Sequence, residues 1–436
     1  MTKKILMITP FFAPQSHAAV FRAHKLSKYL ARKGWQVHVV TVGTNYNYNE
    51  DESLAHELPE KVVIHRVKYV EPTLRGLRMA FGGRDRTYRS TKSPTPVAPS
   101  GELISSTGSG LWQKFYKKIL FSFFYDPDPY WTWANSAKSY CANLVASQKI
   151  NLVYTTSMPY STLKIGSYLK KKCNIKWVAD FRDPLTYNYR NVASSARVLF
   201  HQKNLEKMAL ETADVVTGLS SSYNLIYRDM YGLSEEREVF FIPTGVDDDY
   251  VKGISPIKME YPYIVFVGEY LKEYGDAFFK IFSDVVKKDH SNLKFLMIGN
   301  MSINSRLVAN AITNLGLSDS VILKDHMPQK EVYRYVVGAK AAVLLSGKSS
   351  YWWTNFAKLT DYIGLKVPVI AFVPQISEAR KELTRAKSGI FVDSAEDILS
   401  FLRGTGPVTP DAKYCEKYLA SSMCESFEKI FLDLSR

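Results

Sequence analysis

The sequence predicts an α/β protein with two domains, each built on a parallel β-sheet. The chain has 436 residues, which exceeds the size at which one hydrophobic core usually serves the whole chain. Short apolar runs alternate with amphipathic helical segments, the pattern of a parallel sheet covered by helices. This pattern stops near residues 252–261 and then starts again. We therefore expect an N-terminal domain over residues 1–250, a C-terminal domain over 251–412 and a closing helix over 413–436.

Composition indicates a globular protein with an anionic partner. The apolar content is 46% and the net charge is +15, with a pI of about 9.3. Such a charge favours nucleic acid, acidic lipid headgroups or a phosphorylated substrate as the partner. The sequence carries no zinc-finger, RNA-binding or helix-turn-helix signature, which disfavours nucleic acid. Its 28 Tyr, 23 Phe and 7 Trp residues, several of them close to lysines, favour an anionic membrane surface.

The cysteines and the N-terminus indicate a cytoplasmic protein. Cys141, Cys173, Cys415 and Cys424 show no C-x-x-C spacing and no accompanying histidines, so we expect reduced thiols and no metal site. The first apolar run, KILMIT, is too short for the core of a signal peptide or for a membrane span. It predicts a buried first strand instead.

The first elements form a βαβ unit. Lys4–Thr9 predicts a strand, a helix follows to about Arg32, Gly34 closes that helix, and Val37–Val42 predicts the second strand. No G-x-G-x-x-G fingerprint occurs, but the loop Gln15–Ala19 is where a phosphate would meet a helix N-terminus. Five basic residues of this helix and its end are expected to face solvent: Arg22, Lys25, Lys28, Arg32 and Lys33.

The composition changes after a third predicted strand, Val62–Val67. Residues 71–110 are rich in Arg, Ser, Thr, Pro and Gly without periodicity, so we expect a loop insertion. Residues 111–125 place aromatic side chains at helical spacing and lysines largely opposite, which is typical of a helix lying in a membrane interface. A core helix with solvated lysines is the alternative. The residues expected to contact the membrane are Trp112, Phe115, Tyr116, Lys117 and Lys118. Asp126 and Asp128 resemble a calcium pair, but their prolines favour a turn that ends the helix.

Charged residues gather at the end of a buried strand within residues 151–190. LVYTT predicts a strand, SMPYS a turn and WVADF the next strand. Asp180, Arg182 and Asp183 therefore lie at a carboxyl strand end, beside the turn Ser157–Ser161. Charges in such a place are costly unless they are paired or functional. For Arg182, a structural pair with an aspartate and a contact to a ligand are both open.

The second half predicts another set of strand–helix steps, with strands in YIVFVG, LKFLMIG, VILKDHMP, AAVLLS, VPVIAFV and GIFV. Gly268 and Gly299 each follow a strand, where the chain must turn beside a ligand. Lys358 and Asp361 lie three residues apart on a helical segment before the apolar run Val367–Phe372, so they share one face. Helix N-termini at that sheet edge favour phosphate. The pair would suit a diphosphate and a ribose, and a surface ion pair is the alternative.

The order of these motifs resembles the retaining glycosyltransferases of family 4, and in particular the enzymes that assemble bacterial surface polysaccharides. The likeness rests on ILMITPFFAP, on TTSMPYS followed by WVADFRDPL, on IPTGVD and on FAKLTDYIGLKVPVIA. It covers the chain except residues 71–110. It implies the GT-B fold, with two Rossmann-like domains facing each other across a cleft. It also implies a UDP- or GDP-sugar bound by the second domain, a saccharide or lipid-linked saccharide bound by the first, and neither a metal nor another cofactor.

The resemblance implies donor-binding roles. Asp361 matches the second carboxylate of the E-x7-E motif, which holds the ribose, and Lys358 matches a lysine near the diphosphate. Trp353 stands where the motif has its first carboxylate, and the usual arginine–lysine pair is missing from VGEYLKEYG. Further donor contacts are implied for Ser16, Gly268, Glu269, Lys272, Asn300 and Met327.

The same resemblance implies the catalytic and acceptor-side residues. A retaining transfer needs positive groups that stabilise the departing diphosphate, and Lys358, Lys272 and the loop amides are the candidates for this. Asp180 or Asp183 would orient the acceptor, and its proton would pass to the departing phosphate itself. His17 would contact the acceptor, with a structural role as the alternative. The remaining acceptor-side contacts are expected from Arg182, Ser157 and Tyr160.

Two other classes of function are also compatible with the sequence. A sugar-nucleotide epimerase of the same fold would release a free epimerised nucleotide sugar and has no use for a lipid-facing helix. A non-catalytic, membrane-associated scaffold would not bind nucleotide sugars, and Trp353 is the reason to consider it. For the transferase we expect a cytoplasmic location, peripheral on the inner face of the bacterial cytoplasmic membrane.

Overall fold

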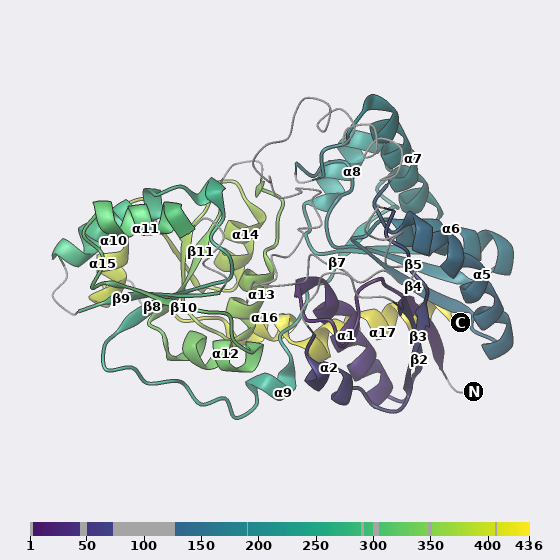
Figure 1. The fold of residues 1–436 in the computed structure, drawn as a ribbon, viewed down its shortest axis with the longest axis horizontal. Coiled ribbons are helices and arrows are strands. Elements are labelled where there is room, and N and C mark those ends of the chain that lie inside the picture. Colours follow the sequence, from purple (N-terminus) through teal and green to yellow (C-terminus); the bar gives the residue numbers. More distant parts are fainter. Residues whose placement is uncertain are drawn as a thin grey trace. The chain divides into compact units, whose positions relative to one another are not determined.

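The computed structural model describes residues 3–43, 50–72, 127–189, 191–288, 292–299, 305–347, 351–405 and 408–436 (Figure 1). The chain divides into unit 1, Met1–Ile242 with Cys424–Arg436, and unit 2, Pro243–Met423. The first boundary therefore precedes the one expected after residue 250. The reason is local, because Val246 N donates to Tyr418 O at 2.7 Å and Val246 O accepts from Ala420 N at 2.8 Å. These bonds tie the segment to unit 2.

Unit 1 is built on a seven-stranded sheet in the order β3-β2-β1-β4-β5-β6-β7. All neighbouring strands are parallel. The strands are β1 (Lys4–Ile8), β2 (Gln36–Val42), β3 (Val62–Val67), β4 (Leu152–Ser157), β5 (Lys176–Phe181), β6 (Val215–Gly218) and β7 (Val239–Phe241). Its helices are α1 (Ala18–Arg32), α2 (Glu52–His56), α5 (Trp131–Gln148), α6 (Ser161–Cys173), α7 (Ala196–Thr212) and α8 (Tyr223–Tyr231). The strand order reverses between β1 and β4.

The prediction that five basic residues at α1 face solvent is wrong for three of them. Arg22, Lys25 and Lys28 are only 1%, 3% and 1% exposed. Arg22 pairs with a buried carboxylate, and Lys28 Nζ lies 3.2 Å from Glu57 Oε2. Their positions on the helix follow from the 3.6-residue period, but which elements pack over that face is decided by the tertiary fold.

The C-terminal helix α17 (Ala420–Leu434) is not a separate closing unit, because its residues divide between the two units. Its second half completes the core of unit 1. Trp35 Nε1 donates to Glu428 Oε1 at 2.9 Å. Phe427 and Phe431 pack edge-on against the ring of Tyr154, with centroid distances of 5.4 and 6.3 Å.

Unit 2 is built on a six-stranded sheet in the order β10-β9-β8-β11-β12-β13, again with parallel neighbours. The strands are β8 (Tyr263–Val267), β9 (Lys294–Ile298), β10 (Val321–Lys324), β11 (Ala341–Leu345), β12 (Val369–Phe372) and β13 (Gly389–Phe391). Helical elements are α9 (Asp248–Val251), η2 (Lys272–Tyr274), α10 (Ala277–Lys288), α11 (Ser305–Asn314), α12 (Gln329–Gly338), α13 (Ala357–Gly364), α14 (Glu378–Arg385), α15 (Ala395–Leu402), α16 (Ala412–Cys415) and η4 (Glu416–Tyr418). The order reverses between β8 and β11.

Two apolar clusters hold this sheet. One joins it to α10, α11 and α15, through residues such as Phe282 and Ile398. The other joins it to α12, α13 and α14, through residues such as Val336 and Leu359. Burial on both faces explains why these strands read as nearly continuous apolar runs in the sequence.

Most of the expected strands and helices are confirmed, and the α/β fold with two parallel-sheet units is confirmed with them. All four cysteines are free thiols. Among the helices of the described residues, none is both long and apolar enough to cross a bilayer. Apart from Glu71 and Pro72, the expected insertion and the helix over 111–125 lie outside the described residues. The membrane contacts Trp112, Phe115, Tyr116, Lys117 and Lys118 lie there too.

Candidate functional site

In unit 2 the switch point between β8 and β11 is the place where a parallel sheet opens a crevice for a ligand. The carboxyl ends of the strands are in register there, with Val267 opposite Ile298 and Leu345 opposite Phe372. Gly268 follows β8, and the segment after β11 leads into α13. A ligand at this edge would therefore meet backbone from two neighbouring strands and the N-terminus of a helix.

The turns after β8 and β9 approach each other very closely. Gly268 has φ +102° and Gly299 has φ +147°, conformations that favour glycine. A Cβ atom on Gly299 would lie 2.6 Å from the carbonyl oxygen of Gly268. Glycine at both positions allows the chain to turn at the strand ends without filling the switch point with side chains.

Lys358 brings a positive charge to this point from the first turn of α13. Its Nζ lies 3.9 Å from the centre of the Phe266 ring and 5.8 Å from that of Tyr274. It also lies 3.6 Å from the position that a Cβ atom on Gly268 would take. The unsatisfied N–H groups of a helix N-terminus carry a partial positive charge. The ammonium group and the helix N-terminus together suit an anion.

Asp361 follows Lys358 by three residues on the same helix. Its side chain is half-buried, and its Oδ1 accepts a hydrogen bond of 2.8 Å from the hydroxyl of Tyr333 on α12. Burial, and then the charge of Asp361, hold the pKa of Tyr333 well above its usual value, so Tyr333 remains a donor. Tyr333 thereby fixes the orientation of this carboxylate.

Several buried polar atoms flank the start of α13. Within the part of the chain that the structure describes, Ser346 Oγ, Thr354 Oγ1 and Asn355 Oδ1 have no hydrogen-bond partner. Ser346 directly follows β11, and Thr354 and Asn355 lie just before α13. Buried polar groups are nearly always satisfied, so a group without a partner needs an explanation. A ligand with hydroxyl or phosphate groups at this edge would supply the missing partners.

The other expected donor residues are less closely grouped. Trp353 is 3% exposed and belongs to the packed interior. Glu269 is half-buried directly after Gly268, Lys272 is exposed on η2, and Met327 packs against the apolar cluster beneath α12 and α13. Asn300 lies outside the described residues.

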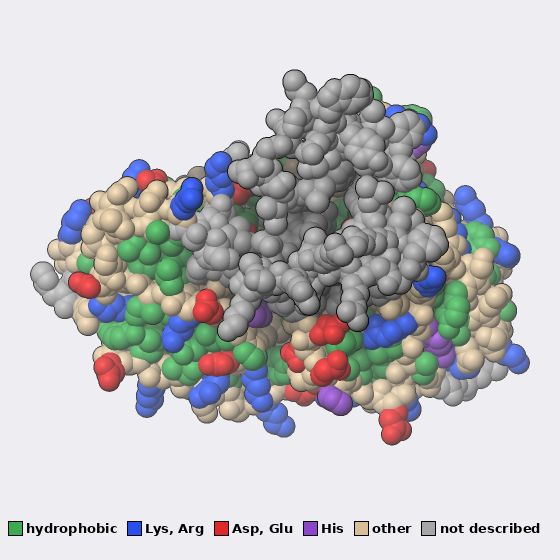
Figure 2. Space-filling view, viewed as in Figure 1, with side chains coloured by type: hydrophobic (Ala, Val, Ile, Leu, Met, Phe, Trp, Pro, Cys, Tyr) green, Lys and Arg blue, Asp and Glu red, His purple; other side chains and the backbone are tan. Residues whose placement is uncertain are grey.

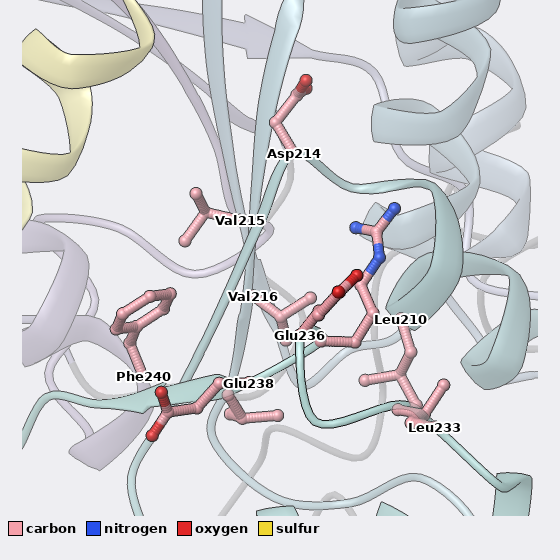
Figure 3. A pocket seen from close by; sticks show the side chains of 10 residues that line it. Leu210, Asp214, Val215, Val216, Leu233, Glu236, Glu238 and Phe240 are labelled. Carbon is pink, nitrogen blue, oxygen red and sulfur yellow. The ribbon is translucent and has the colours of Figure 1, made fainter.

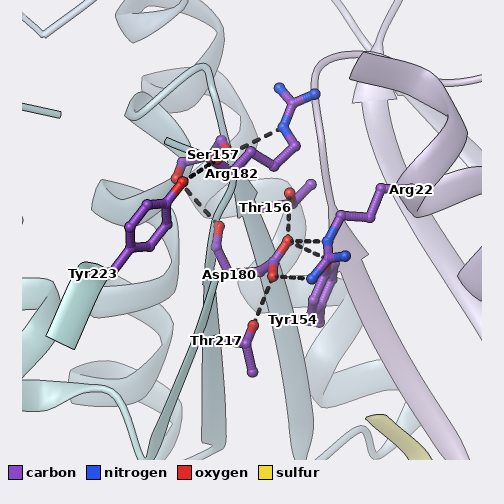
Figure 4. A network of polar contacts seen from close by, with 8 residues as sticks. All are labelled: Arg22, Tyr154, Thr156, Ser157, Asp180, Arg182, Thr217 and Tyr223. Atoms are coloured by element: carbon purple, nitrogen blue, oxygen red, sulfur yellow. Dashed lines mark hydrogen bonds and ion pairs between the residues drawn. The ribbon is translucent and has the colours of Figure 1, made fainter. Parts of the chain in front are cut away.

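In unit 1, Asp180 lies at the carboxyl end of β5 inside a hydrogen-bonded network (Figure 4). Arg22 donates to it twice, from Nε to Oδ2 and from Nη2 to Oδ1, each at 2.8 Å. Three hydroxyl groups, from Tyr154, Thr156 and Thr217, donate to the same carboxylate at 2.7, 3.0 and 2.7 Å. The carboxylate is therefore fully occupied by groups of the protein.

This arrangement contradicts the catalytic role expected for Asp180. The residue is 0% exposed. Burial would raise the pKa of the carboxyl group, but the charge of Arg22 and the hydrogen bonds outweigh it and lower the pKa below its usual value. A permanently charged, saturated carboxylate has no lone pair left for an acceptor and no proton to exchange. Asp180 does take part in a structural ion pair with an arginine, as considered above. Its partner is Arg22 and not Arg182.

Arg182 instead holds the turn after β4. Its Nε donates to Ser157 O at 3.1 Å, and its guanidinium group also donates to Met158 O. The hydroxyl of Tyr160 donates to Pro184 O at 2.8 Å, and Ser157 Oγ donates to Asp180 O at 3.2 Å. Ser157 is 0% and Tyr160 3% exposed. Both position the backbone, and their expected contacts with an acceptor are not supported by this burial.

Asp183, His17 and Arg182 are the expected acceptor-side residues that retain some exposure, and of these Arg182 is engaged with the turn after β4. His17 is the N-cap of α1, where its Nδ1 accepts from Ala19 N at 3.3 Å. Burial, and then the positive charge of Arg182, lower the pKa of His17 to about 3. The imidazole is therefore neutral at pH 7 and presents a hydrogen-bonding side chain without a charge. Ser16, which precedes it, is half-buried in the same loop.

A buried carboxylate that the sequence did not reveal supports the loop that carries Asp183. Glu206 on α7 is 0% exposed and accepts from the backbone N–H groups of Leu185 and Thr186. The hydroxyls of Thr186 and Tyr231 donate to the same Oε2 at 2.6 and 2.7 Å. In the sequence, the only sign that Glu206 supports this loop is a glutamate at an inward position of α7. The sequence gave no sign that Arg22 binds Asp180 or that Tyr333 binds Asp361.

A separate small pocket opens at the amino-terminal ends of β6 and β7 (Figure 3). It is lined by Leu210, Asp214, Val215, Val216, Leu233, Glu236, Arg237, Glu238, Val239 and Phe240. Ligands of parallel sheets bind beyond the opposite, carboxyl ends. The switch point of each unit, taken by itself, is therefore the better candidate for binding a ligand. Within the described residues, no three His, Cys, Asp or Glu side chains are grouped so that they could hold a metal ion.

Comparison with known proteins gives a family match for part of the chain and a similar fold for the whole chain. Residues 247–403 match the family described as Glycosyl transferases group 1. Sucrose-phosphate synthase from Thermosynechococcus elongatus is similar in structure, with a TM-score of 0.60, 15% sequence identity and 99% of both chains covered. A glycosyltransferase from Rickettsia africae has a TM-score of 0.60 and 14% identity, covering 100% of this chain and 99% of that one.

The Anabaena protein HepE in complex with UDP-glucose gives a TM-score of 0.59 and 11% identity, with 99% of both chains covered. No curated protein sequence matches the chain. The structural likeness shows the GT-B fold, and together with the match of residues 247–403 it supports a GT-B glycosyltransferase.

Proposed function

We propose that this chain is a retaining glycosyltransferase of family 4 that moves a sugar from a UDP- or GDP-sugar to a saccharide or lipid-linked saccharide in the assembly of bacterial surface glycans. Unit 2 binds the donor and unit 1 the acceptor. The protein works in the cytoplasm at an anionic membrane surface and needs no metal ion. The observation that carries the proposal is Lys358 beside Gly268 at the N-terminus of α13, with Asp361 held by Tyr333 one turn later.

The donor is bound through its diphosphate and its ribose. Lys358 and the N–H groups at the start of α13 contact the diphosphate, because both carry positive charge at the switch point. Asp361, oriented by the hydroxyl of Tyr333, accepts hydrogen bonds from the ribose hydroxyls. The similarity of residues 247–403 to group 1 glycosyl transferases, and of the fold to a protein complexed with UDP-glucose, supports a nucleotide sugar as donor.

The sugar itself is recognised by neutral groups. In the described part of the chain, Ser346 Oγ and Asn355 Oδ1 are buried and without a hydrogen-bond partner. A carboxylate at the position of Trp353 would instead bring a negative charge. Sugar hydroxyls donate and accept hydrogen bonds, and they would satisfy both atoms.

In the transfer step, the bond between the anomeric carbon and the β-phosphate oxygen breaks while the bond to the acceptor oxygen forms. Negative charge develops on the departing diphosphate, and Lys358 stabilises it. The proton of the acceptor hydroxyl passes to an oxygen of the departing phosphate, so no protein base is needed. Asp183 and the neutral His17 orient the acceptor in unit 1, and Asp180 acts only through the network it anchors.

The experiment is thermal stabilisation of the full chain by a panel of UDP-sugars, GDP-sugars and free nucleotides. A ligand at 100 times its dissociation constant stabilises the folded state by about 2.7 kcal/mol, which a melting curve resolves. We expect a selective shift with one base. Asp361→Ala should abolish the shift, and Asp284→Ala, which removes an exposed carboxylate on α10, should leave it unchanged.

Three results would contradict the proposal. A chain that none of the nucleotide sugars stabilises would be a scaffold with a degraded donor site. Release of a free epimerised nucleotide sugar, without transfer to an acceptor, would identify an epimerase. Equal stabilisation of the wild-type chain and Asp361→Ala would remove the donor site from the start of α13.

A further inference from the structure

One surface of unit 1 combines exposed apolar and basic side chains. It lies on the loop after β5 and on the first two turns of α7, which Figure 1 shows in teal beside α8. Val192 is 80%, Phe200 63% and Leu199 37% exposed. Arg197 and Lys203 are exposed on the same helix. We call Val192, Arg197, Leu199, Phe200 and Lys203 the cationic apolar face.

The segment that carries this face contains few acidic residues. Between residues 187 and 210 the sequence contains one acidic residue, Glu206, and that side chain is 0% exposed and bonded inward. The first exposed carboxylate after the face is that of Glu211, whose Oε1 lies 3.6 Å from the Nζ of Lys207. Elsewhere, acidic and basic side chains are mixed over the described surface that Figure 2 shows. The cationic apolar face therefore departs from the charge pattern around it.

The exposure of Phe200 follows from its place on α7. Ala196, Phe200 and Lys203 recur at helical spacing and share the outward face, whereas Val198 and Leu205 on the opposite side are buried. A single exposed apolar side chain is normal for a soluble protein. Two large apolar side chains are exposed on this helix, and a third, Val192, is exposed in the loop that precedes it, which requires an explanation.

The loop that presents Val192 is held in place. Asn191 Nδ2 donates to Leu185 O at 2.9 Å, in the segment that Glu206 binds. At the other end of the loop, Ser195 Oγ accepts from Val198 N at 3.3 Å and caps α7. The loop is therefore anchored on both sides of Val192, so docking of this surface needs little ordering of the chain.

We propose that the cationic apolar face docks unit 1 on an anionic lipid bilayer. Val192 and Phe200 enter the headgroup region, and Arg197 and Lys203 contact lipid phosphates. Apolar insertion combined with basic side chains is the physical basis of interfacial membrane binding, and exposed cations complement anionic headgroups. The inference rests on the proposed function. The face follows Asp183 along the chain, so docking would bring the acceptor side of unit 1 to the surface where a lipid-linked acceptor resides.

The test measures binding of the full chain to phosphatidylcholine vesicles with and without phosphatidylglycerol. We expect the wild-type chain to bind the anionic vesicles. Phe200→Asp should lower the partition coefficient at least about tenfold, because it puts a charge in place of an aromatic side chain that enters the membrane. Lys203→Glu should remove the preference for anionic vesicles. The matched control is Ile376→Asp in unit 2, which makes the same kind of change at a side chain 83% exposed and should bind like wild type.

Full vesicle binding by Phe200→Asp would overturn the inference, and so would a wild-type chain that binds neither kind of vesicle. If Phe200→Asp instead dissociated a dimer in sedimentation, a second copy of the chain would cover this face. Stabilisation by UDP, measured on the same variants, separates the two proposals. Phe200 lies outside the donor site, so Phe200→Asp should retain the UDP shift. Phe200-dependent vesicle binding without a shift by either UDP or GDP would overturn the donor site and leave the docking surface standing.

Discussion

Units 1 and 2 share a doubly wound parallel sheet, but they treat the polar residues at the carboxyl ends of their strands differently. In unit 1, Asp180 and Glu206 are fully buried, and each is surrounded by donors from the protein itself. In unit 2, the described residues include buried polar atoms at Ser346 and Asn355 that have no partner. The buried carboxylates of unit 1 are thus closed by internal bonds, whereas the segments beside α13 in unit 2 retain buried atoms with unused hydrogen-bonding capacity. Among the described residues of unit 1, Gln15 Oε1 in the loop after β1 also lacks a partner, so the contrast concerns the carboxylates and not the whole sheet edge.

This contrast separates two meanings of a charged residue at a strand end. A charge that is costly to bury must be compensated, and compensation by the protein makes it structural while compensation by a ligand makes it functional. Asp180 belongs to the first kind, because Arg22 and three hydroxyls occupy it. Lys358 and Asp361 lie beside atoms that still need partners, which favours the second kind.

The largest expected effect tests the structural assignment of Asp180. Asp180→Ala leaves the charge of Arg22 buried without its partner and should destabilise unit 1 by about 3–5 kcal/mol. Urea unfolding of the full chain, followed by hydrogen exchange in β5 and α1, measures this loss. The matched change Asp183→Asn, at a half-buried position, should leave stability near wild type and slow transfer. An Asp180→Ala chain that is fully stable but inactive would return Asp180 to the catalytic residues.

A slightly smaller effect is expected from the charge at the start of α13. Lys358→Met removes the ammonium group that stabilises the departing diphosphate and should lower the transfer rate by roughly 10²–10³-fold, or about 2.7–4 kcal/mol. Initial rates with saturating donor measure it. Lys330→Met removes an exposed lysine from α12 and is the control. Equal rates for the two variants would show that the chemistry does not occur at the start of α13.

The orientation of Asp361 by Tyr333 predicts a moderate loss. Tyr333→Phe removes the 2.8 Å hydrogen bond to Asp361 while keeping the ring in the core. We expect UDP to bind about tenfold more weakly, or about 1.4 kcal/mol, because the carboxylate is no longer held in one orientation. Calorimetric titration with UDP measures the change. Unchanged affinity would mean that Tyr333 satisfies a structural carboxylate, as Arg22 does in unit 1.

An effect of similar size concerns His17 and its pKa of about 3. Below pH 6.5 the unfolded chain binds a proton that the folded His17 does not bind until about pH 3, so stability falls as the pH falls through this window. His17→Asn keeps a side chain suited to capping α1 but does not titrate. Between pH 7.5 and pH 5 the wild type should therefore lose about 1–2 kcal/mol more than the variant.

Urea unfolding at the two pH values measures this difference. Parallel losses in wild type and His17→Asn would show that His17 protonates freely in the folded chain, which would place it in contact with solvent rather than in the closed strand-end environment of unit 1.

The sequence by itself determined the architecture and the helix face that Lys358 and Asp361 share. Strands such as β5 and β8 were predicted because a strand buried on both faces is a continuous apolar run. The glycines that end β8 and β9 were predicted because the chain must turn there. Lys358 and Asp361 were predicted on one helix face from their spacing alone. Local periodicity and backbone conformation carry this information, and neither depends on distant residues.

The tertiary structure alone decided which charged side chains have partners within the protein. Arg22 was expected in solvent and instead reaches Asp180, 158 residues further along the chain. Tyr333 is 28 residues from the carboxylate that it orients. A local pattern fixes the face on which a side chain lies, but its partner and burial depend on which elements pack over that face. Whether a charge is structural or available to a ligand therefore follows from packing between distant segments.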